Sequence, residues 1–181
     1  MGVHMKRKVR ISILVLCLFI SLIFSACAPN VVITPDLPIV HSEDFSLGGK
    51  IDYEGNAEYL PRTVSAEPHP EATLTLRYRY EVTYGRDAVH QVLPFLNPLT
   101  IVGFPIGADT VVVTAKLEVL KASFQVKAYT AVCILDKHRT IFWEGETLSE
   151  LRRRGLLAVR DNIETQMYGD RDLLLKGSGE D

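Results

Sequence analysis

The side chains that could carry out catalysis or hold a metal ion are dispersed along this sequence. No histidine has a partner at a metal-ligand spacing such as H-x-x-x-H; those beyond the N-terminal region are His41, His69, His90 and His138. In "YGRDAVH", Asp87 and His90 form the nearest thing to a catalytic pair, but catalytic groups are recognised by their geometry. There is no G-x-S-x-G elbow, phosphate-binding loop or paired-carboxylate signature. We therefore expect no enzyme activity, no cofactor and no metal site.

The first residues carry a targeting signal. The positive patch "KRKVR", Lys6 to Arg10, is followed by an apolar run without a charge from Ile11 to Phe24. A transmembrane helix needs about 18 to 20 apolar residues, whereas the apolar region of a secretory signal needs about 7 to 15. The run is therefore typical of a signal peptide and too short for a permanent membrane span.

The chemistry that the sequence does indicate lies directly after this run, in "FSAC", Phe24 to Cys27. This tetrapeptide resembles the lipobox of bacterial lipoprotein precursors, although that family usually has leucine where this chain has Phe24. The resemblance implies that Cys27 takes a diacylglyceryl group on its sulfur, becomes the N-terminus after cleavage and is then acylated on its amine. An ordinary signal-peptidase cut beside "SACA" is the alternative. The resemblance ends at about Ala28 and implies nothing about the fold.

The same resemblance implies a location and an organisation. In that family an aspartate after the cysteine commonly retains the protein in the inner membrane, and this chain has Ala28 there, which implies a lipoprotein of the outer membrane that faces the periplasm. Acyl chains that contribute about 0.8 kcal/mol per buried methylene make such an anchor effectively permanent. We expect a signal peptide at 1–26, a lipidated N-terminus with a proline-rich tether at 27–44, a single domain at 45–175 and a disordered tail at 176–181.

The remaining cysteine is expected to be structural. Cys17 leaves with the signal peptide and Cys27 is acylated, so only Cys133 stays free and no intramolecular disulfide can form. Its surroundings, "TAVCIL", are apolar, which predicts a buried small side chain and not a reactive thiol.

Alternating apolar and polar residues predict an antiparallel sheet of four or five strands. "TLTLRYRYEVTY", Thr73 to Tyr84, alternates throughout, and so does "TVVVTAKLEVLK", Thr110 to Lys121. A tight turn at "KASF" joins the latter to "SFQVKAYTAVCILD", after which "DKHR" is expected to turn the chain into a further strand, "TIFWEG". A weak strand is expected at Phe45 to Tyr53. A transmembrane barrel also suits a long two-faced strand, but it needs at least eight strands, so only an oligomer that pools strands from several chains could close one.

A helix is expected to cover one face of this sheet. Thr147-Leu148-Ser149-Glu150 matches a capping box, so the helix begins there. An apolar stripe follows at helical spacing, formed by Leu148, Leu151, Gly155, Val159, Ile163 and Met167. The fold class is therefore α+β: a small antiparallel sheet covered on one face by a C-terminal helix and preceded by a flexible tether.

The segment "VLPFLNPLTIVGFPIG", Val92 to Gly107, is apolar but broken by prolines and glycines. It is interpreted either as a loop folded over the core or as a surface that meets a partner or the bilayer, because exposed apolar patches mark such sites. The candidate contact residues are Leu93, Phe95, Leu96, Leu99, Ile101, Phe104 and Ile106.

Charge and composition narrow the function classes. The formal net charge of −2 gives no electrostatic attraction for nucleic acid, so no nucleic-acid partner is expected. The basic run Arg152 to Arg154 is interpreted as a solvated helix face. These features favour a non-catalytic lipoprotein that acts as an accessory or scaffold component of a cell-envelope complex. It would contact the membrane through Cys27 and would bind an unidentified envelope protein. The alternative is a periplasmic lipoprotein that binds a lipid or small molecule in a cavity on the sheet.

Overall fold

The computed structural model describes residues 30–40, 45–65, 74–86, 107–139 and 145–178. Two compact units make up the chain. The unit formed by residues 31–85, 110–136 and 146–181 contains both described helices and the whole buried core. The other unit comprises residues 1–30, 86–109 and 137–145, and most of it lies outside the described residues. The single domain expected at 45–175 stays a prediction.

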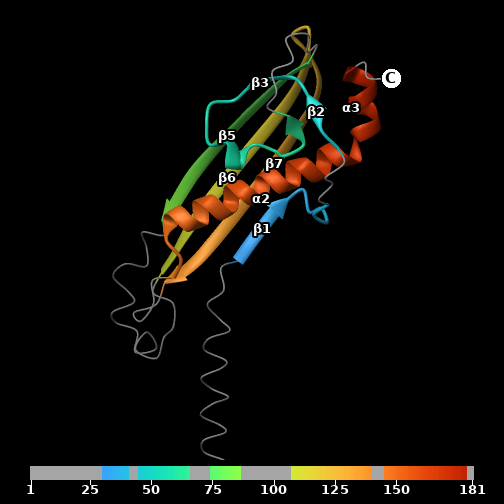
Figure 1. The fold of residues 1–181 in the computed structure, drawn as a ribbon. Helices are drawn as coiled ribbons and strands as arrows, with labels where there is room; N and C mark the ends of the chain where they lie inside the picture. Colours follow the sequence, from blue (N-terminus) through green and yellow to red (C-terminus); the bar gives the residue numbers. More distant parts are fainter. Residues whose placement is uncertain (1–29, 41–44, 66–73, 87–106, 140–144, 179–181) are drawn as a thin grey trace, which may run out of the picture. The chain divides into compact units, whose positions relative to one another are not determined.

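The chain forms an α+β fold, as the sequence predicts (Figure 1). The main sheet has five strands in the order β1-β7-β6-β5-β3. Its strands are β1 (Asn30–Thr34), β3 (Lys50–Asp52), β5 (Leu74–Arg86), β6 (Gly107–Lys121) and β7 (Phe124–Arg139). A second, two-stranded sheet pairs β2 (Leu47–Gly48) with β4 (Val64–Ser65), and a short 3-10 helix, η1 (Ala57–Tyr59), lies between β3 and β4.

The main sheet is mixed, so the prediction of a purely antiparallel sheet was wrong. Edge strand β3 runs parallel to β5, with Ile51 opposite Leu76. The sequence contains the reason: the segment after β3 includes η1 and β4 before the chain returns as β5, and a parallel neighbour requires a long crossover of this kind.

The hairpin of β6 and β7 follows from alternation and a tight turn. Ala122 and Ser123 connect the strands with φ angles of 49° and 73°. Two consecutive positive φ values are characteristic of a type I′ turn, whose twist matches that of the strands it joins. The segment "DKHR" does not turn the chain as expected, because β7 continues to Arg139. The Thr110 hydroxyl donates to the Asp136 carboxylate at 2.6 Å, which ties β6 to this part of β7.

Helix α2 (Leu148–Gly169) begins where the capping box predicts. The Thr147 side chain accepts a hydrogen bond from the Glu150 amide, and the Glu150 side chain accepts one from the Thr147 amide. The predicted apolar stripe is buried from Leu151 to Met167, but its first member, Leu148, is exposed. At Gly155 an added Cβ would lie 2.6 Å from Val113 Cγ2, so the absence of a side chain allows the helix to approach β6 closely.

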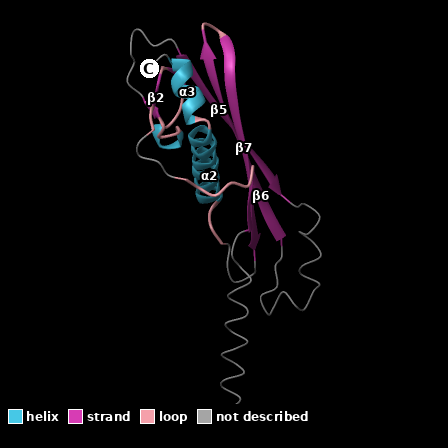
Figure 2. Cartoon of the chain, turned by 90° about the vertical axis from the view of Figure 1, so that its right-hand side faces the viewer, coloured by secondary structure: helices cyan, strands magenta, loops and turns pink. Residues whose placement is uncertain are grey.

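Helices α2 and α3 (Arg171–Ser178) lie on one face of the main sheet (Figure 2). The buried side chains of β6 and β7 alternate along this covered face, from Val111 to Val119 and from Tyr129 to Leu135. The opposite side, which we call the open sheet face, has no covering element among the described residues. Its apolar side chains include Val32, Val112, Leu120, Phe124, Val126, Val132 and Ile134, all half-buried or exposed.

The segment expected to be a flexible tether is folded where the structure describes it. Asn30–Thr34 forms edge strand β1, which pairs with β7. Beyond it, Asn162 Nδ2 donates to the Pro35 carbonyl at 2.7 Å, and the Val40 amide donates to Thr165 Oγ1 at 3.2 Å. The prolines flank the strand without interrupting it, and the β-branched residues between them favour a strand. The expected disordered tail is likewise helical as far as Ser178.

A cluster of tyrosines fills the core between β3, β5 and η1. Tyr78 is fully buried, and its ring lies 5.4 Å from that of Tyr53 in an edge-to-face arrangement. Tyr80 contacts the rings of Tyr53, Tyr59 and Tyr78. Among the described residues, the Tyr78 hydroxyl is the one buried side-chain polar group without a hydrogen-bond partner. Burial therefore raises the pKa of Tyr78.

Candidate functional site

Most residues proposed from the sequence as site residues lie outside the described parts of the chain. These are Cys27 and the contact candidates Leu93, Phe95, Leu96, Leu99, Ile101, Phe104 and Ile106, together with Asp87 and three of the histidines. His138 is half-buried on β7. Cys133 is buried and free, as predicted, and burial raises the pKa of its thiol to about 11.

The described residues form an open groove of about 530 Å³ at the C-terminal end of α2. One wall is the extended segment after β1, with Leu37, Pro38 and Val40. The start of β7 forms the floor and the last turn of α2 the other wall. The lining is completed by Lys127, Ala128, Tyr129, Thr165, Gln166, Tyr168, Gly169 and Asp170. A groove of this size, mainly apolar with a few polar groups, has the character of a small-ligand site.

Buried polar side chains of α2 hold the first wall in place. Asn162 is buried and, besides binding the Pro35 carbonyl, accepts a hydrogen bond from Gln166 Nε2 at 2.8 Å. Gln166 Nε2 also donates to the Thr130 carbonyl of β7 at 3.0 Å. Thr165 Oγ1 donates to the Asp161 carbonyl of its own helix and accepts from Val40. Because these bonds connect the segment, the helix and the strand, the groove is a fixed feature of the fold.

The polar end of the groove is built around Asp170. Lys127 Nζ lies 2.8 Å from Asp170 Oδ2, and the Tyr129 hydroxyl donates to the same oxygen at 3.1 Å. The hydrogen bond from Lys127 is the main reason that the pKa of Asp170 lies below its usual range, with a further contribution from Tyr129. Burial, and then the negative charge of Asp170, raise the pKa of Tyr129. Because Lys127, Tyr129 and Asp170 bind one another, the groove presents an ion pair and not an isolated charge.

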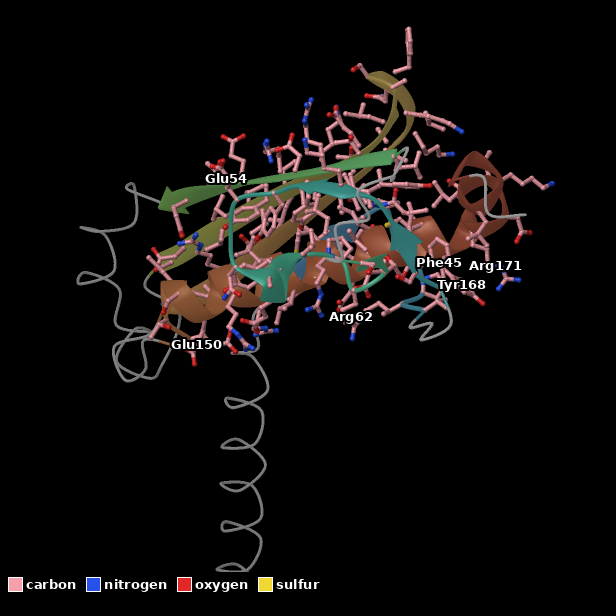
Figure 3. The ribbon with its side chains drawn as sticks, turned by 45° about the horizontal axis from the view of Figure 1, so that its top comes forward. Phe45, Glu54, Arg62, Glu150, Tyr168 and Arg171 are labelled. Atoms are coloured by element: carbon pink, nitrogen blue, oxygen red, sulfur yellow. The ribbon has the colours of Figure 1, made fainter. Side chains whose placement is uncertain are left out.

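The rim of the groove carries a stacked pair at the junction of α2 and α3. The Arg171 guanidinium lies over the Tyr168 ring, 5.0 Å from its centroid, and Nη1 donates to the Tyr168 hydroxyl at 2.8 Å (Figure 3). A cation above an aromatic face is stabilised by the ring quadrupole. The pair therefore fixes the tyrosine at the edge of the groove.

Three of the four arginines of α2 form ion pairs within the fold, and Arg152 is exposed. Arg154 binds Glu146 at 2.6 Å, and Arg153 binds Glu58 of η1. Arg160 binds Asp161 and donates to the Glu58 carbonyl at 2.7 Å.

A second set of charges secures the segment before β4 to the helix. Arg62 donates from its amide and its guanidinium to the buried carboxylate of Glu164, and Figure 3 marks Arg62 beside α2. The hydrogen bond with Glu164 raises the pKa of Arg62. These contacts hold the segment before β4 against α2.

Within the described residues, no group of three or more His, Cys, Asp or Glu side chains could hold a metal ion. The same part of the chain has no helix that is both long and apolar enough to cross a membrane.

Sequence reasoning missed the groove. The segment around Leu37 reads as linker because of its prolines, and nothing in the pattern of α2 indicates that Asn162 and Thr165 bind it. The one available signal was the set of polar residues, Asn162, Thr165 and Gln166, within an otherwise amphipathic helix, since buried polar groups need partners.

No protein-family model matches this chain, and no curated protein matches it.

Proposed function

We propose that this chain is a lipoprotein of the bacterial outer membrane that is anchored through acylated Cys27 and acts as a non-catalytic accessory or scaffold component of a cell-envelope complex. The observation that carries this proposal is the order of features at the N-terminus: a basic patch, an apolar run of signal-peptide length, the small pair Ser25-Ala26 and then Cys27.

Features of the fold are consistent with a scaffold role. The core between α2 and the sheet is closely packed, with Leu156, Val159 and Ile163 fully buried. Arg153, Arg154 and Arg160 of α2 are engaged in ion pairs. A rigid body of this kind presents fixed surfaces to a partner at low ordering cost.

Acylation is tested by the intact mass of the mature protein and by its membrane partitioning. The Cys27→Ser variant should lose both the acyl mass and the membrane fraction. Cys17→Ser is the matched control, since that cysteine leaves with the signal peptide. An unmodified terminus on the wild-type protein, or unchanged partitioning of Cys27→Ser, would disprove the anchor.

The scaffold role is tested by crosslinking in cells and identification of the crosslinked protein. Phe95 and Phe104 are the contact candidates to change, because aromatic residues on a proline-rich segment suit a partner surface. Serine at both positions should abolish the crosslink and leave the thermal unfolding curve unchanged. Loss of the folded state would instead assign these residues to the core.

The groove favours a second candidate function, a periplasmic lipoprotein that binds a lipid or small molecule. Gly169 lines the groove, and a Cβ added there meets no atom within 4 Å. Gly169→Leu should therefore obstruct the groove without a packing cost. Gly48→Leu is the matched control, because an added Cβ at that glycine also meets nothing and Gly48 lies on β2. Saturable binding of a fluorescent fatty acid that is lost in the first variant alone would support this function, and the absence of binding would reject it.

A further inference from the structure

The start of β1 sets how far the folded body can lie from an acylated Cys27. Val31 is already part of the larger unit, and it follows Cys27 by four residues. An extended chain spans at most about 3.3 to 3.6 Å per residue, so the link reaches no more than about 14 Å. If Cys27 is anchored as proposed above, the start of β1 must lie within about 14 Å of the bilayer surface and cannot hang from a long tether.

The side chains around β1 are suited to such a surface. Val32 points away from the covered face, because its neighbour Ile33 packs against the core. Val32 is 49% exposed, and on the adjacent strand β7 the same open sheet face carries Val126 and Ile134, which are 44% and 36% exposed. Exposed apolar side chains therefore gather on the two strands nearest the anchor.

On β3, β5 and β6 the open sheet face carries paired charges beside the half-buried Val112 and Leu120 of β6. On β5, Arg77 and Arg79 each bind a different oxygen of Asp52 at 2.7 Å. On β6, Lys116 binds Glu118 at 2.6 Å. These charged groups bind one another, and the exposed apolar side chains of β1 and β7 are the part of the face that gains by leaving water.

The opposite side of the body is more highly charged, although Leu148 on α2 and Leu173 on α3 are 37% and 50% exposed. The outward surface of α2 carries the arginines and carboxylates described above. Helices α2 and α3 cover one side of the sheet, and the open sheet face has no described element over it (Figure 2). An anchored protein has a high effective concentration at the bilayer, so even a few exposed apolar side chains suffice to orient it.

We infer that the open sheet face, along β1 and β7, rests on the lipid bilayer and that α2 is turned toward the aqueous side. This inference depends on the proposed acylation of Cys27. It assigns a lipid surface as the partner of an otherwise uncovered apolar face.

The test uses the full mature lipoprotein reconstituted in phospholipid vesicles, with a fluorophore attached to a single introduced cysteine. Buried Cys133, whose pKa is raised, will not react with a water-soluble reagent, so the introduced thiol alone is labelled. The sheet positions are Val126→Cys and Ile134→Cys. The control is Leu173→Cys on α3, an apolar residue that is 50% exposed.

Vesicles that contain a nitroxide-labelled lipid headgroup should quench the fluorophore at the two sheet positions several-fold more than at the control. A Val32→Asp change in the Val126→Cys protein should reduce this quenching, and the matched Leu173→Asp change should not. Equal quenching at all positions would overturn the inference. It would also be overturned if the sheet labels were shielded from water by a second copy of the protein and were not quenched by the labelled lipid.

The two proposals fail in different ways. If the protein floats with the vesicles and has the acyl mass but shows no preference between faces, acylation stands and the orientation is wrong. If the acyl mass is absent and the protein does not float, both are wrong.

Discussion

Replacing Tyr78 with phenylalanine should stabilise the protein. The Tyr78 side chain is fully buried, and its hydroxyl has no hydrogen-bond partner among the described residues. A buried hydroxyl without a partner costs about 1 to 3 kcal/mol, and phenylalanine retains the ring that packs against Tyr53. We therefore expect Tyr78→Phe to raise the free energy of unfolding by about 1 kcal/mol.

Tyr129 provides the matched control, because it is also buried but has a partner. Its hydroxyl donates to Asp170 Oδ2 at 3.1 Å, and hydrogen bonds to charged groups contribute about 1.5 to 3 kcal/mol. Tyr129→Phe should therefore lower the free energy of unfolding by at least about 1 kcal/mol. The two variants remove the same atom and should shift stability in opposite directions.

Urea titrations followed by far-ultraviolet circular dichroism measure both changes. In thermal scans, 1 kcal/mol corresponds to a shift of about 2 to 4 °C for a protein of this size. A Tyr78→Phe protein that is destabilised as much as Tyr129→Phe would refute the reasoning, since it would show that the Tyr78 hydroxyl is satisfied.

The alkaline limb of the stability curve gives an independent check. Because burial raises the pKa of Tyr78, the folded state keeps the phenol neutral at a pH where the unfolded chain ionises. The resulting stability is fully present below about pH 10 and decreases as the pH rises above that value. Tyr78→Phe should make this alkaline decrease less steep.

Three further predictions concern a turn, a packing contact and an ion pair. Ser123→Gly should raise the free energy of unfolding by about 1 kcal/mol, because glycine adopts the residue's positive φ of 73° without strain. Urea titration measures this change, and a loss of stability would contradict the prediction. Gly155→Ala should lower stability by about 1 to 3 kcal/mol despite the better helix propensity of alanine, since the new Cβ would lie 2.6 Å from a methyl group of Val113. An unchanged melting temperature would show that β6 shifts to accommodate the Cβ. Asp170→Asn should lower the free energy of unfolding at neutral pH and remove a part of the stability loss that the wild-type protein shows below about pH 4. The lowered pKa of Asp170 contributes stability that is present above its ordinary pKa and disappears as the pH falls. Acid titrations in which the two proteins lose stability in parallel would contradict this.

The regular elements could be predicted because local chemistry determines them. Alternation between Leu74 and Tyr84 is observed as β5, and the threonine and glutamate of the capping box begin α2 at the expected residue. Burial along β5 does not follow the alternation to its end. Tyr78 is fully buried, but Tyr84, on the same parity, is 51% exposed. A period of two predicts which side of the sheet a residue lies on, whereas its burial depends on which elements cover that side.

The groove and the mixed sheet could not be predicted, since both depend on contacts between distant parts of the chain. The Asn162 side chain binds the Pro35 carbonyl across 127 positions of sequence, and β3 joins the sheet beside β5 in parallel. Near Cys133, β7 carries apolar residues on both of its sides. In the described structure one side packs on α2, and the other, with Ile134, contributes to the open sheet face.

The incorrect prediction of a tether has the largest consequence for the proposed function. Proline favours extended backbone and cannot donate to a sheet ladder, so a chain with spaced prolines is commonly a linker. Pro29 precedes β1 and Pro35 follows it, and the strand between them is "NVVIT", whose three apolar β-branched residues favour pairing. Prolines in these positions mark the ends of a strand and not a linker. Since β1 is part of the sheet, an anchor at Cys27 would hold the start of β1 within about 14 Å of the bilayer surface, and a partner would bind a body that is held close to the membrane and not one that hangs from a long linker.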